Sequence, residues 1–381
     1  MSPVRRARRA TRLALPMVAA LVVVACSGTA STPPATSTPG QPTGTPSAAT
    51  SAPAATGTSA SPSGPAGSPG ALPAPEVTQV KAGTVPDTTA HDAEVAVEDG
   101  LFAKNGLTVT TQMFTTDGDM VTALLAGQVD MIFTAGVAGP IGSLATNSPL
   151  VVVMMSHDNI PDNLYTAKNV KTAADLKGKS IAISSFASDT YGEALVMLAQ
   201  LGLSPSDVTI TPIGDDAARR AALVAGSVAG SLNDRAEKPA MAALGFNVLL
   251  ASQDITGKLP VSAVVTTRAY AQKNPNTVLA VVASLLQGLH TFLTNPADAA
   301  QAAVKFEKID LATATADVQA DLPGWTPQNG RPTLAEFQLA QSFFSKTDPA
   351  LAKVDVSQAF TTQFVDQLQS LGWYQANGIA P

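Results

Sequence analysis

Small and hydroxyl-bearing residues follow the ends of four expected strands, where they can serve as ligand-binding groups. The four segments are residues 84–89, 134–137, 184–191 and 232–234. Each leads into an expected helix, whose first N–H groups and partial positive charge favour a small anion. In open α/β sheets, ligands bind at such strand ends. We therefore expect a binding site that includes Thr84, Asp87, Thr88, Thr89, Thr134, Ala135, Gly136, Val137, Ser184, Ser188, Asp189, Thr190, Tyr191, Asn233 and Asp234.

Acidic residues in the same loops leave the charge of the ligand open. Asp87, Asp189 and Asp234 either cap their helices or point into the cleft. If one or more points inward, a ligand with an amine or a ring nitrogen is favoured over sulfonate or nitrate. The aromatic side chains expected to cover the apolar face of such a ligand are Phe186, Tyr191 and Trp325.

The sequence shows no constellation of catalytic or metal-binding residues. Its three histidines, at positions 91, 157 and 290, are widely spaced and lack the spacing of metal ligands. Cys26 is the single cysteine, so we expect no internal disulfide and no thiol site. We expect a binding protein without cofactor or metal, not an enzyme.

A helix followed by a buried strand lies at the centre of the chain. Apolar residues at positions 120, 121, 124 and 125 share one helix face, and Asp117 or Asp119 is placed to cap its beginning. Gly127 is placed to end the helix. The apolar run 129–133 then predicts a short strand that stops at a loop.

This helix–strand unit is echoed about a hundred residues later. Ala-Leu-Leu-Ala-Gly-Gln-Val at 123–129 returns as Ala-Leu-Val-Ala-Gly-Ser-Val at 222–228, and a similar Gly-Leu segment precedes each copy. The repeated order predicts two lobes built on the same βαβ plan.

Four segments together resemble the nitrate/sulfonate/taurine-type substrate-binding proteins of ABC importers, the SsuA/THI5-like or NMT1-like family, in lipoprotein form. They are residues 100–109, 123–130, 175–183 and 222–228, and the resemblance covers most of 76–300. The second copy departs from the pattern, because Ala229 stands where the family commonly has aspartate.

The resemblance implies an α/β, two-lobed type II periplasmic-binding-protein fold, with a mostly parallel, helix-covered sheet in each lobe. The ligand cleft would lie at a two-crossover hinge. It implies a monomer that delivers a small polar or anionic organic molecule to a membrane permease. The alternative ligand is a thiamine-precursor pyrimidine or similar heterocycle. Less favoured alternatives are an enzyme on the same fold, related to thiamine-pyrimidine synthases or menaquinone-pathway dehydratases, and a surface sensor or adhesin.

The N-terminus reads as a lipoprotein signal. Five arginines precede an apolar run at 13–25 that is too short to span a bilayer, which indicates a signal peptide over residues 1–25. Val-Val-Ala-Cys at 23–26 matches a lipobox, so we expect Cys26 to carry a lipid. This predicts an extracytoplasmic protein anchored to the outer face of the cell membrane, and it argues against the intracellular enzymes.

Residues 26–75 are expected to form a disordered tether. The stretch 27–75 is rich in Ser, Thr, Pro, Ala and Gly and contains no charged residue, so it cannot build a core. Without the five signal arginines, 18 basic and 29 acidic side chains remain, a formal charge of −11. A surface with this charge repels nucleic acid.

The remaining chain divides into two expected lobes. Residues 76–167 and 261–381 are assigned to the first lobe with its C-terminal helices, and residues 168–260 to the second. The polar segment 163–172 is interpreted as the first crossover and residues 257–262 as the return. Two crossovers predict a hinge.

Overall fold

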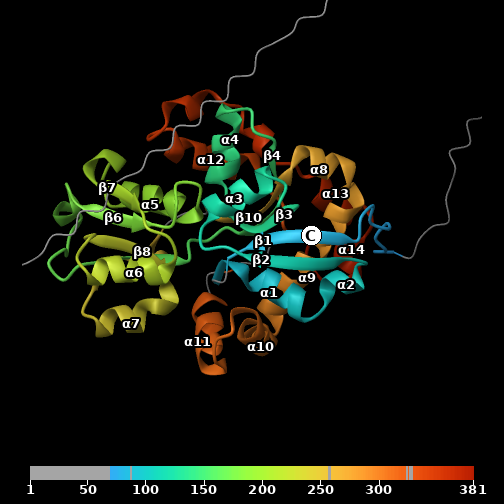
Figure 1. The fold of residues 1–381 in the computed structure, drawn as a ribbon, viewed down its shortest axis with the longest axis horizontal. Helices are drawn as coiled ribbons and strands as arrows, with labels where there is room; N and C mark the ends of the chain where they lie inside the picture. Colours follow the sequence, from blue (N-terminus) through green and yellow to red (C-terminus); the bar gives the residue numbers. More distant parts are fainter. Residues whose placement is uncertain (1–68, 86–87, 256–258, 323–324, 326–328) are drawn as a thin grey trace, which may run out of the picture. The chain divides into compact units, whose positions relative to one another are not determined.

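The computed structural model describes residues 69–85, 88–255, 259–322, 325 and 329–381. The expected signal peptide, Cys26 and most of the expected tether lie outside the described residues, as does Asp87. The described chain forms two sheets of five strands each, covered by helices, which confirms the predicted two-lobed α/β fold (Figure 1).

Lobe 1 is defined by the sheet with strand order β2-β1-β3-β10-β4. Its strands are β1 (Gln79–Thr84), β2 (Thr108–Met113), β3 (Met131–Gly136), β4 (Leu150–His157) and β10 (Ser262–Thr267). β10 runs antiparallel to both of its neighbours, β3 and β4, whereas the other four strands run in one direction. Strands β3 and β4 are buried along their whole length, which explains their continuous apolar sequences.

Lobe 2 is defined by the sheet with strand order β7-β6-β8-β5-β9. Its strands are β5 (Asp162–Thr166), β6 (Ser180–Ile183), β7 (Thr209–Pro212), β8 (Gly230–Asp234) and β9 (Asn247–Leu250). β5 is the antiparallel strand here, between β8 and β9. Each sheet therefore contains one reversed strand, and in each case the chain enters that strand as it arrives from the other lobe.

The first crossover does not lie where the sequence placed it. Residues 163–172 were expected to cross between lobes as a polar segment, but Asp162–Thr166 forms the buried strand β5. Its polar groups are paired inside the lobe: Asn163 accepts a hydrogen bond from the Ser252 N–H (2.8 Å) and Thr166 donates one to the Val170 carbonyl (2.8 Å). The crossing segment is therefore residues 158–161, between β4 and β5.

Helix α9 (Pro275–Thr294) forms the centre of the lobe 1 core. It is long and apolar enough to cross a membrane, but 72% of its apolar window is buried inside the protein. It packs so closely on α1 (His91–Glu98) that a Cβ at Gly288 would lie 2.1 Å from the carbonyl oxygen of Asp92. The hydrophobicity of α9 is thus that of a core helix.

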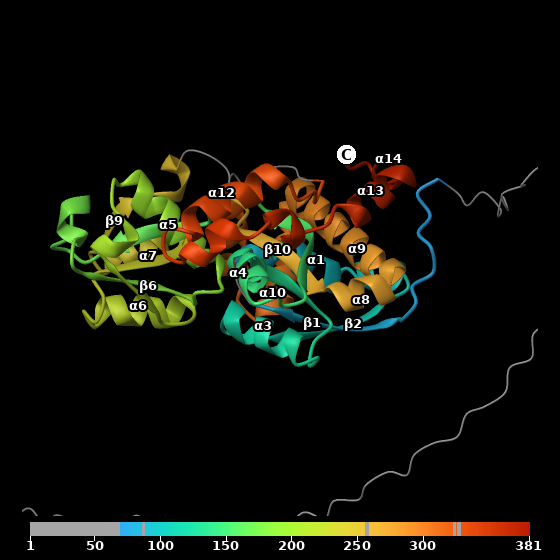
Figure 2. The same cartoon turned by 90° about the horizontal axis from the view of Figure 1, so that it is seen from above.

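The other helices of lobe 1 include α11 (Leu311–Asp321). The remaining α-helices of this lobe are α2 (Leu101–Lys104), α3 (Asp117–Leu125), α4 (Ala138–Ala145), α8 (Arg268–Lys273), α10 (Pro296–Glu307), α12 (Leu334–Phe344), α13 (Gln363–Ser370) and α14 (Trp373–Ala376). In Figure 2, α12 lies beside the lobe 2 helix α5 (Asp189–Gln200), and the two are in contact.

The sequence echo corresponds to equivalent positions in the two lobes. Helix α3 ends at Gly127, which has φ +69°, and leads into β3; helix α6 (Asp216–Val224) ends at Gly226, which has φ +72°, and leads into β8. Both glycines occupy the left-handed region that other residues rarely adopt. The third α-helix of lobe 2 is α7 (Lys238–Ala243).

Candidate functional site

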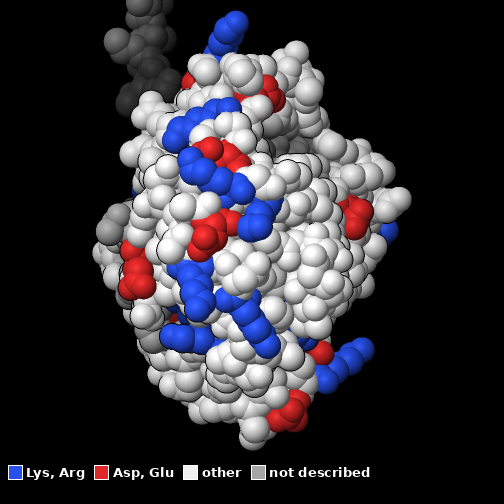
Figure 3. Space-filling model, turned by 90° about the vertical axis from the view of Figure 1, so that its left-hand side faces the viewer, with Lys and Arg blue, Asp and Glu red and all other residues white. Residues whose placement is uncertain are grey.

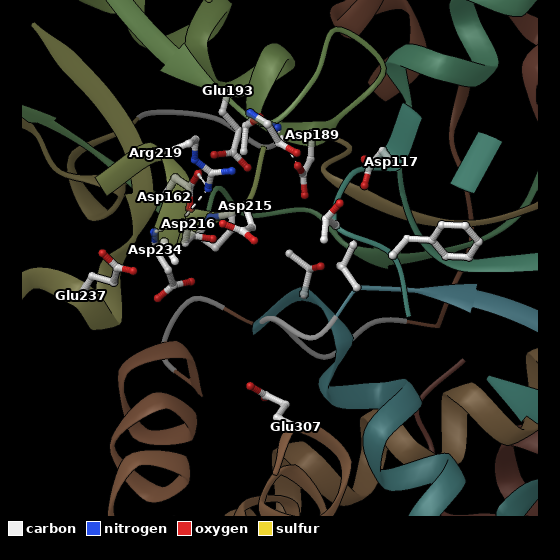
Figure 4. A pocket seen from close by; sticks show the side chains of 18 of the residues that line it. Asp117, Asp162, Asp189, Glu193, Asp215, Asp216, Arg219, Asp234, Glu237 and Glu307 are labelled. Atoms are coloured by element: carbon white, nitrogen blue, oxygen red, sulfur yellow. Dashed lines mark hydrogen bonds and ion pairs between the residues drawn. The ribbon is translucent and has the colours of Figure 1, made fainter. Parts of the chain in front are cut away.

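A cavity of about 470 Å³ lies between the two lobes (Figure 4). Its wall is formed mainly by residues that follow the carboxyl ends of strands, β1 and β2 in lobe 1 and β6, β7 and β8 in lobe 2. The lining residues are Val85, Thr89, Phe114, Thr115, Asp117, Pro161, Asp162, Ser184, Asp189, Thr190, Glu193, Asp215, Asp216, Ala217, Arg219, Asp234, Glu237, Glu307 and Ile309. This interlobe cavity is where an open α/β sheet binds its ligand.

The wall of the cavity is strongly acidic. Nine of its described lining residues are Asp or Glu, and Arg219 is the one cationic side chain among them. Figure 4 shows the acidic side chains of lobe 2 gathered around Arg219, with Asp117 and Glu307 approaching from the lobe 1 side. An enclosed surface of one charge sign focuses its field into the cavity and selects for ligands of the opposite sign.

The charge of the cavity differs from that of the outer surface of lobe 2. Exposed lysines of this lobe include Lys168, Lys171, Lys177 and Lys238. Figure 3 shows Lys and Arg side chains interspersed with acidic ones over that end of the molecule. The acidic wall is therefore a local property of the cavity.

Arg219 is already engaged by protein acceptors and holds α6 against β8. Its Nε donates to the Leu232 carbonyl, its Nη1 to the Gly214 carbonyl and its Nη2 to Asp216, each at 2.7 Å. Its Nη2 also lies 3.8 Å from Oδ2 of Asp162. Because each guanidinium nitrogen has a protein partner and the side chain is buried, Arg219 is not arranged as a clamp for an anionic ligand.

Two carboxyl groups in the wall are buried without enough hydrogen-bond donors. Glu193 on α5 is 0% exposed, and neither of its carboxylate oxygens has a hydrogen-bond partner among the described residues. The same holds for Oδ2 of Asp162, at the start of β5. Burial raises the pKa of Glu193 well above its ordinary value, and neighbouring Asp189 raises it further. Burial and the charge of Glu193 likewise raise the pKa of Asp162 well above its ordinary value.

The helix starts that were expected to bind an anion are occupied by acidic side chains of the protein. Asp189 accepts a hydrogen bond from the Thr190 N–H (2.6 Å) at the beginning of α5. Asp215 accepts one from the Ala218 N–H (2.8 Å) at the beginning of α6, and Asp234 accepts one from the Ala236 N–H (2.6 Å). Both alternatives for Asp189 and Asp234 therefore hold: they bond to helix N–H groups and they also line the cavity.

Some of the residues expected from the sequence meet at the cavity and others pack beside it. The described wall contains Thr89, Ser184, Asp189, Thr190 and Asp234. The expected residues that the described wall does not contain are Thr84, Thr134, Ala135, Gly136, Val137, Ser188, Tyr191 and Asn233. Asp87 lies outside the described residues, as does the side chain of Thr88.

The hydroxyl groups at the start of α5 hold their own loop together. Ser188 Oγ donates to the Ser185 carbonyl (2.6 Å), and Thr190 Oγ1 accepts from the Ser184 N–H (2.9 Å). The two hydroxyl oxygens lie 2.7 Å apart. Both side chains are buried, so these hydroxyls fix the position of the acidic residues beside them.

The end of strand β3 supports the start of α5 across the two lobes. A Cβ at Gly136 would lie 2.2 Å from the backbone nitrogen of Asp189, so only glycine permits this approach. The Gly136 N–H also donates to Oδ2 of Asp117 (2.9 Å), which lines the cavity from lobe 1. The lobes therefore meet through the backbone at this point.

The aromatic residues proposed from the sequence do not line the described wall. Trp325 is 4% exposed and stacks on the ring of His157, with ring centroids 4.4 Å apart. Tyr191 stacks on Phe344 of α12, with centroids 5.8 Å apart, and Phe186 is 53% exposed. The wall instead contains Phe114.

Several acidic residues of the wall escaped the sequence analysis. The missed residues are Asp117, Asp162, Glu193, Asp215, Asp216, Glu237 and Glu307. Asp215 and Asp216 follow β7 as the other candidates follow their strands, so the same rule applied to that strand would have found them. Glu193 lies four positions before the buried Met197 on the apolar face of α5, which marked it as a buried acid.

The sequence of the chain is similar to known families and to known binding proteins. Residues 92–299, more than half of the chain, match the NMT1/THI5 like family model. The chain is 27% identical over 289 residues to the riboflavin-binding protein RibY of Chloroflexus aurantiacus, covering 71% of this chain and 81% of RibY.

Solved structures share the fold at lower identity. The alkanesulfonate-binding protein SsuA from Xanthomonas axonopodis pv. citri, bound to MOPS, is 21% identical with a TM-score of 0.62 and covers 75% of this chain and 99% of its own. The desulfurization enzyme DSZB is 14% identical with a TM-score of 0.54, over 77% of this chain and 99% of its own. By the extent of its family match, this chain belongs to the NMT1/THI5-like family.

Proposed function

We propose that the protein is the extracytoplasmic solute-binding component of an ABC importer, which captures a small molecule between its lobes and delivers it to a membrane permease. The interlobe cavity carries this proposal, because two sheets direct the ends of their strands into one cavity. The chain crosses between the lobes twice, before β5 and before β10, and such a connection allows the lobes to close around a ligand.

The N-terminal sequence supports placing the protein outside the cell membrane. The apolar run 13–25 and the lipobox ending at Cys26 would direct export and lipid attachment. The uncharged stretch 27–75 would then separate the folded body from the lipid surface by about 40 Å if it behaves as a flexible coil. This arrangement suits a monomer that must meet both free solute and a permease.

Binding without chemical change is favoured over catalysis by the composition of the wall. Its described lining residues include no Cys, His or Lys, so the hydroxyls of Thr89, Thr115, Ser184 and Thr190 have no imidazole or amine base among them. Because an enzyme shares the fold, the fold alone does not decide between the two functions. The acidic wall also weighs against the sulfonate- or nitrate-like ligand expected from the family resemblance.

The experiment that tests this function is identification of the retained solute. The full mature chain carrying Cys26→Ser is purified from secreting cells and analysed by native mass spectrometry. We expect a small molecule bound at one per chain, which is released unchanged on denaturation and raises the melting temperature when added back. Conversion of that molecule to a product during incubation would support an enzyme. A chain that retains no small molecule and responds to none of a broad solute panel would contradict the proposal.

A further inference from the structure

We propose that the interlobe cavity takes an organic cation with a primary ammonium or guanidinium group, and that Glu193 and Asp162 are its buried counter-charges. This inference rests on the proposed solute-binding function and specifies the chemical class of the solute. It depends on the pairing of an acidic cavity with two buried carboxyl groups that lack hydrogen-bond donors.

The two carboxyl groups are buried and lack hydrogen-bond donors. Glu193 is 0% exposed and Asp162 is 4% exposed, and both line the cavity. Three oxygens, both of Glu193 and Oδ2 of Asp162, have no hydrogen-bond partner among the described residues. A buried carboxylate is costly unless donors or a positive charge compensate it. A ligand with several N–H groups on a cationic centre supplies both.

The cationic groups around the pair provide only part of that compensation, although Nη2 of Arg219 lies 3.8 Å from Oδ2 of Asp162. The guanidinium of Arg219 donates hydrogen bonds to the Leu232 and Gly214 carbonyls and to the Asp216 carboxylate. Arg235 also acts on Glu193, but its side chain donates to the carbonyls of Ile160 (2.9 Å) and Pro161 (3.1 Å).

The other groups acting on the pair are acidic. Asp189 and Asp234 raise the pKa of Glu193, and Asp216 and Asp234 raise that of Asp162. The surroundings of the two carboxyl groups therefore keep an excess of negative charge that a cationic ligand would neutralise.

Three other ligand classes fit the wall less well. An anion would face nine acidic residues, and the beginnings of α5 and α6 already bond to Asp189 and Asp215. A quaternary ammonium ion is usually held by several aromatic faces, whereas Phe114 is the one aromatic residue in the described wall. No group of three side chains that could hold a metal ion occurs among the described residues. Hydrogen-bonding organic cations remain as the class that matches the unpaired oxygens.

The cavity also limits the size and shape of the cation. Its volume of about 470 Å³ is in the range that holds a small organic molecule. Val85, Phe114, Pro161 and Ile309 give part of the wall an apolar character. A cation with a short alkyl chain or a ring would place its charged end at Glu193 and Asp162 and its apolar part against these residues.

The test compares matched probes of opposite charge on the full mature chain carrying Cys26→Ser, in buffer with EDTA. The cationic probes are agmatine and 1,5-diaminopentane with a wider set of primary amines and guanidines. The controls are choline, nitrate and pentane-1-sulfonate with other sulfonates. We expect thermal shifts from members of the cationic set and none from the anions, with affinities measured by calorimetry.

Variants connect the binding to the named residues. Glu193→Gln and Asp162→Asn keep the shape of each side chain and remove its charge, and we expect each to weaken the best cationic probe at least tenfold. Glu98→Gln, on α1 and outside the cavity wall, removes the same charge from the protein and should leave that affinity unchanged. Circular dichroism and the melting temperature of each ligand-free variant establish that it is folded.

The outcomes separate this inference from the proposed function. Binding of a sulfonate, nitrate or another anion with no response to any cation would overturn the ligand class and leave the solute-binding function intact. Cation binding that is equally strong in Glu193→Gln and Asp162→Asn would overturn the assignment of the two counter-charges. If neither the cationic nor the anionic probes bind, and no solute is retained on purification, the solute-binding function itself is contradicted.

Discussion

Arg235 and Asp321 form an ion pair that joins the two lobes, with Nε of the arginine 3.2 Å from Oδ1 of the aspartate. Arg235 follows β8 in lobe 2, and Asp321 is the last residue of α11 in lobe 1. The other oxygen of Asp321 lies 3.3 Å from Nε2 of His91, whose Nδ1 lies 3.0 Å from Glu94. Asp321 is thus a fully buried acid between two cationic partners, since Asp321 and Glu94 outweigh burial and raise the pKa of His91 well above its ordinary value.

We predict that Asp321→Asn lowers the free energy of unfolding by about 3–5 kcal/mol, because it leaves the buried His91 and the partly buried Arg235 without their shared counter-charge. Asp366→Asn is the matched control: Asp366 pairs with Arg331, but both side chains are substantially exposed. This second substitution should cost about 1 kcal/mol or less. Urea unfolding monitored by circular dichroism measures the free energy of unfolding of both variants. Equal losses of this free energy would show that burial does not increase the contribution of the Asp321 ion pair to stability.

Gly136→Ala should prevent the close approach of the lobes. Its Cβ would lie 2.2 Å from the backbone nitrogen of Asp189, and backbone atoms cannot move aside as a flexible side chain can. We expect solute affinity to fall at least tenfold and the radius of gyration in scattering to rise. Gly142→Ala on α4 is the control, because a Cβ there meets nothing within 4 Å. If Gly136→Ala binds solute like the unmodified chain, the contact is not required for closure.

The acidic cavity predicts how the stability of the ligand-free protein depends on pH. Glu193 and Asp162 have pKa values raised in the folded state, so the folded protein binds more protons than the unfolded chain in the interval above their ordinary values. Their stabilising contribution is complete below those ordinary values and is lost as the pH rises through the folded-state values. We therefore expect the urea midpoint to fall as the pH rises above the ordinary carboxyl values.

Glu193→Gln isolates the contribution of one group to this pH dependence. The raised pKa of His91 produces a loss of the same sign, so the comparison must be between variants and not between pH values alone. We expect the midpoint of Glu193→Gln to fall less steeply with pH than that of the unmodified chain. Parallel profiles would show that Glu193 titrates alike in the folded and unfolded states.

Cys26→Ser should abolish lipid attachment, because the lipid is joined to a lipoprotein through the cysteine sulfur. Growth with a clickable fatty acid should label the unmodified chain and leave the variant unlabelled. The variant should also be released from the membrane or mislocalised. Ser27→Ala, next to the modified residue, should still be labelled. A labelled, membrane-bound Cys26→Ser chain would show that the lipobox interpretation is wrong.

The sequence predicted most elements of the fold because their signals are local. Gly127 and Gly226 end their helices in the left-handed conformation in both lobes, and the apolar run at 129–133 leads into the buried strand β3. Strand β5 escaped prediction because its polar residues are satisfied by distant partners. Asn163, for example, is bonded to the Ser252 N–H, which lies 89 positions away.

The lining of the interlobe cavity was predicted only in part for a similar reason. The strand-end rule named Asp189, Thr190 and Asp234, which line the cavity, and also Ser188, which the described wall does not contain. Ser188 is buried, and its hydroxyl donates a hydrogen bond to the Ser185 carbonyl of its own loop. Periodicity shows which side of a helix is buried, but it does not show that Glu193 on that side faces a cavity and not the apolar core.

The position of β10 determines when each lobe can be completed as the chain emerges N-terminus first. Every strand of the lobe 2 sheet lies between residues 162 and 250, so that sheet can pair as soon as this stretch is available. In lobe 1, β10 separates β3 from β4, and its last residue is Thr267. One edge of β3 and both edges of β4 therefore remain unpaired, with apolar side chains, until the residues of lobe 2 have been synthesised. Lobe 1, which begins the chain, is therefore completed after lobe 2. A chaperone is needed most before β10 has been synthesised.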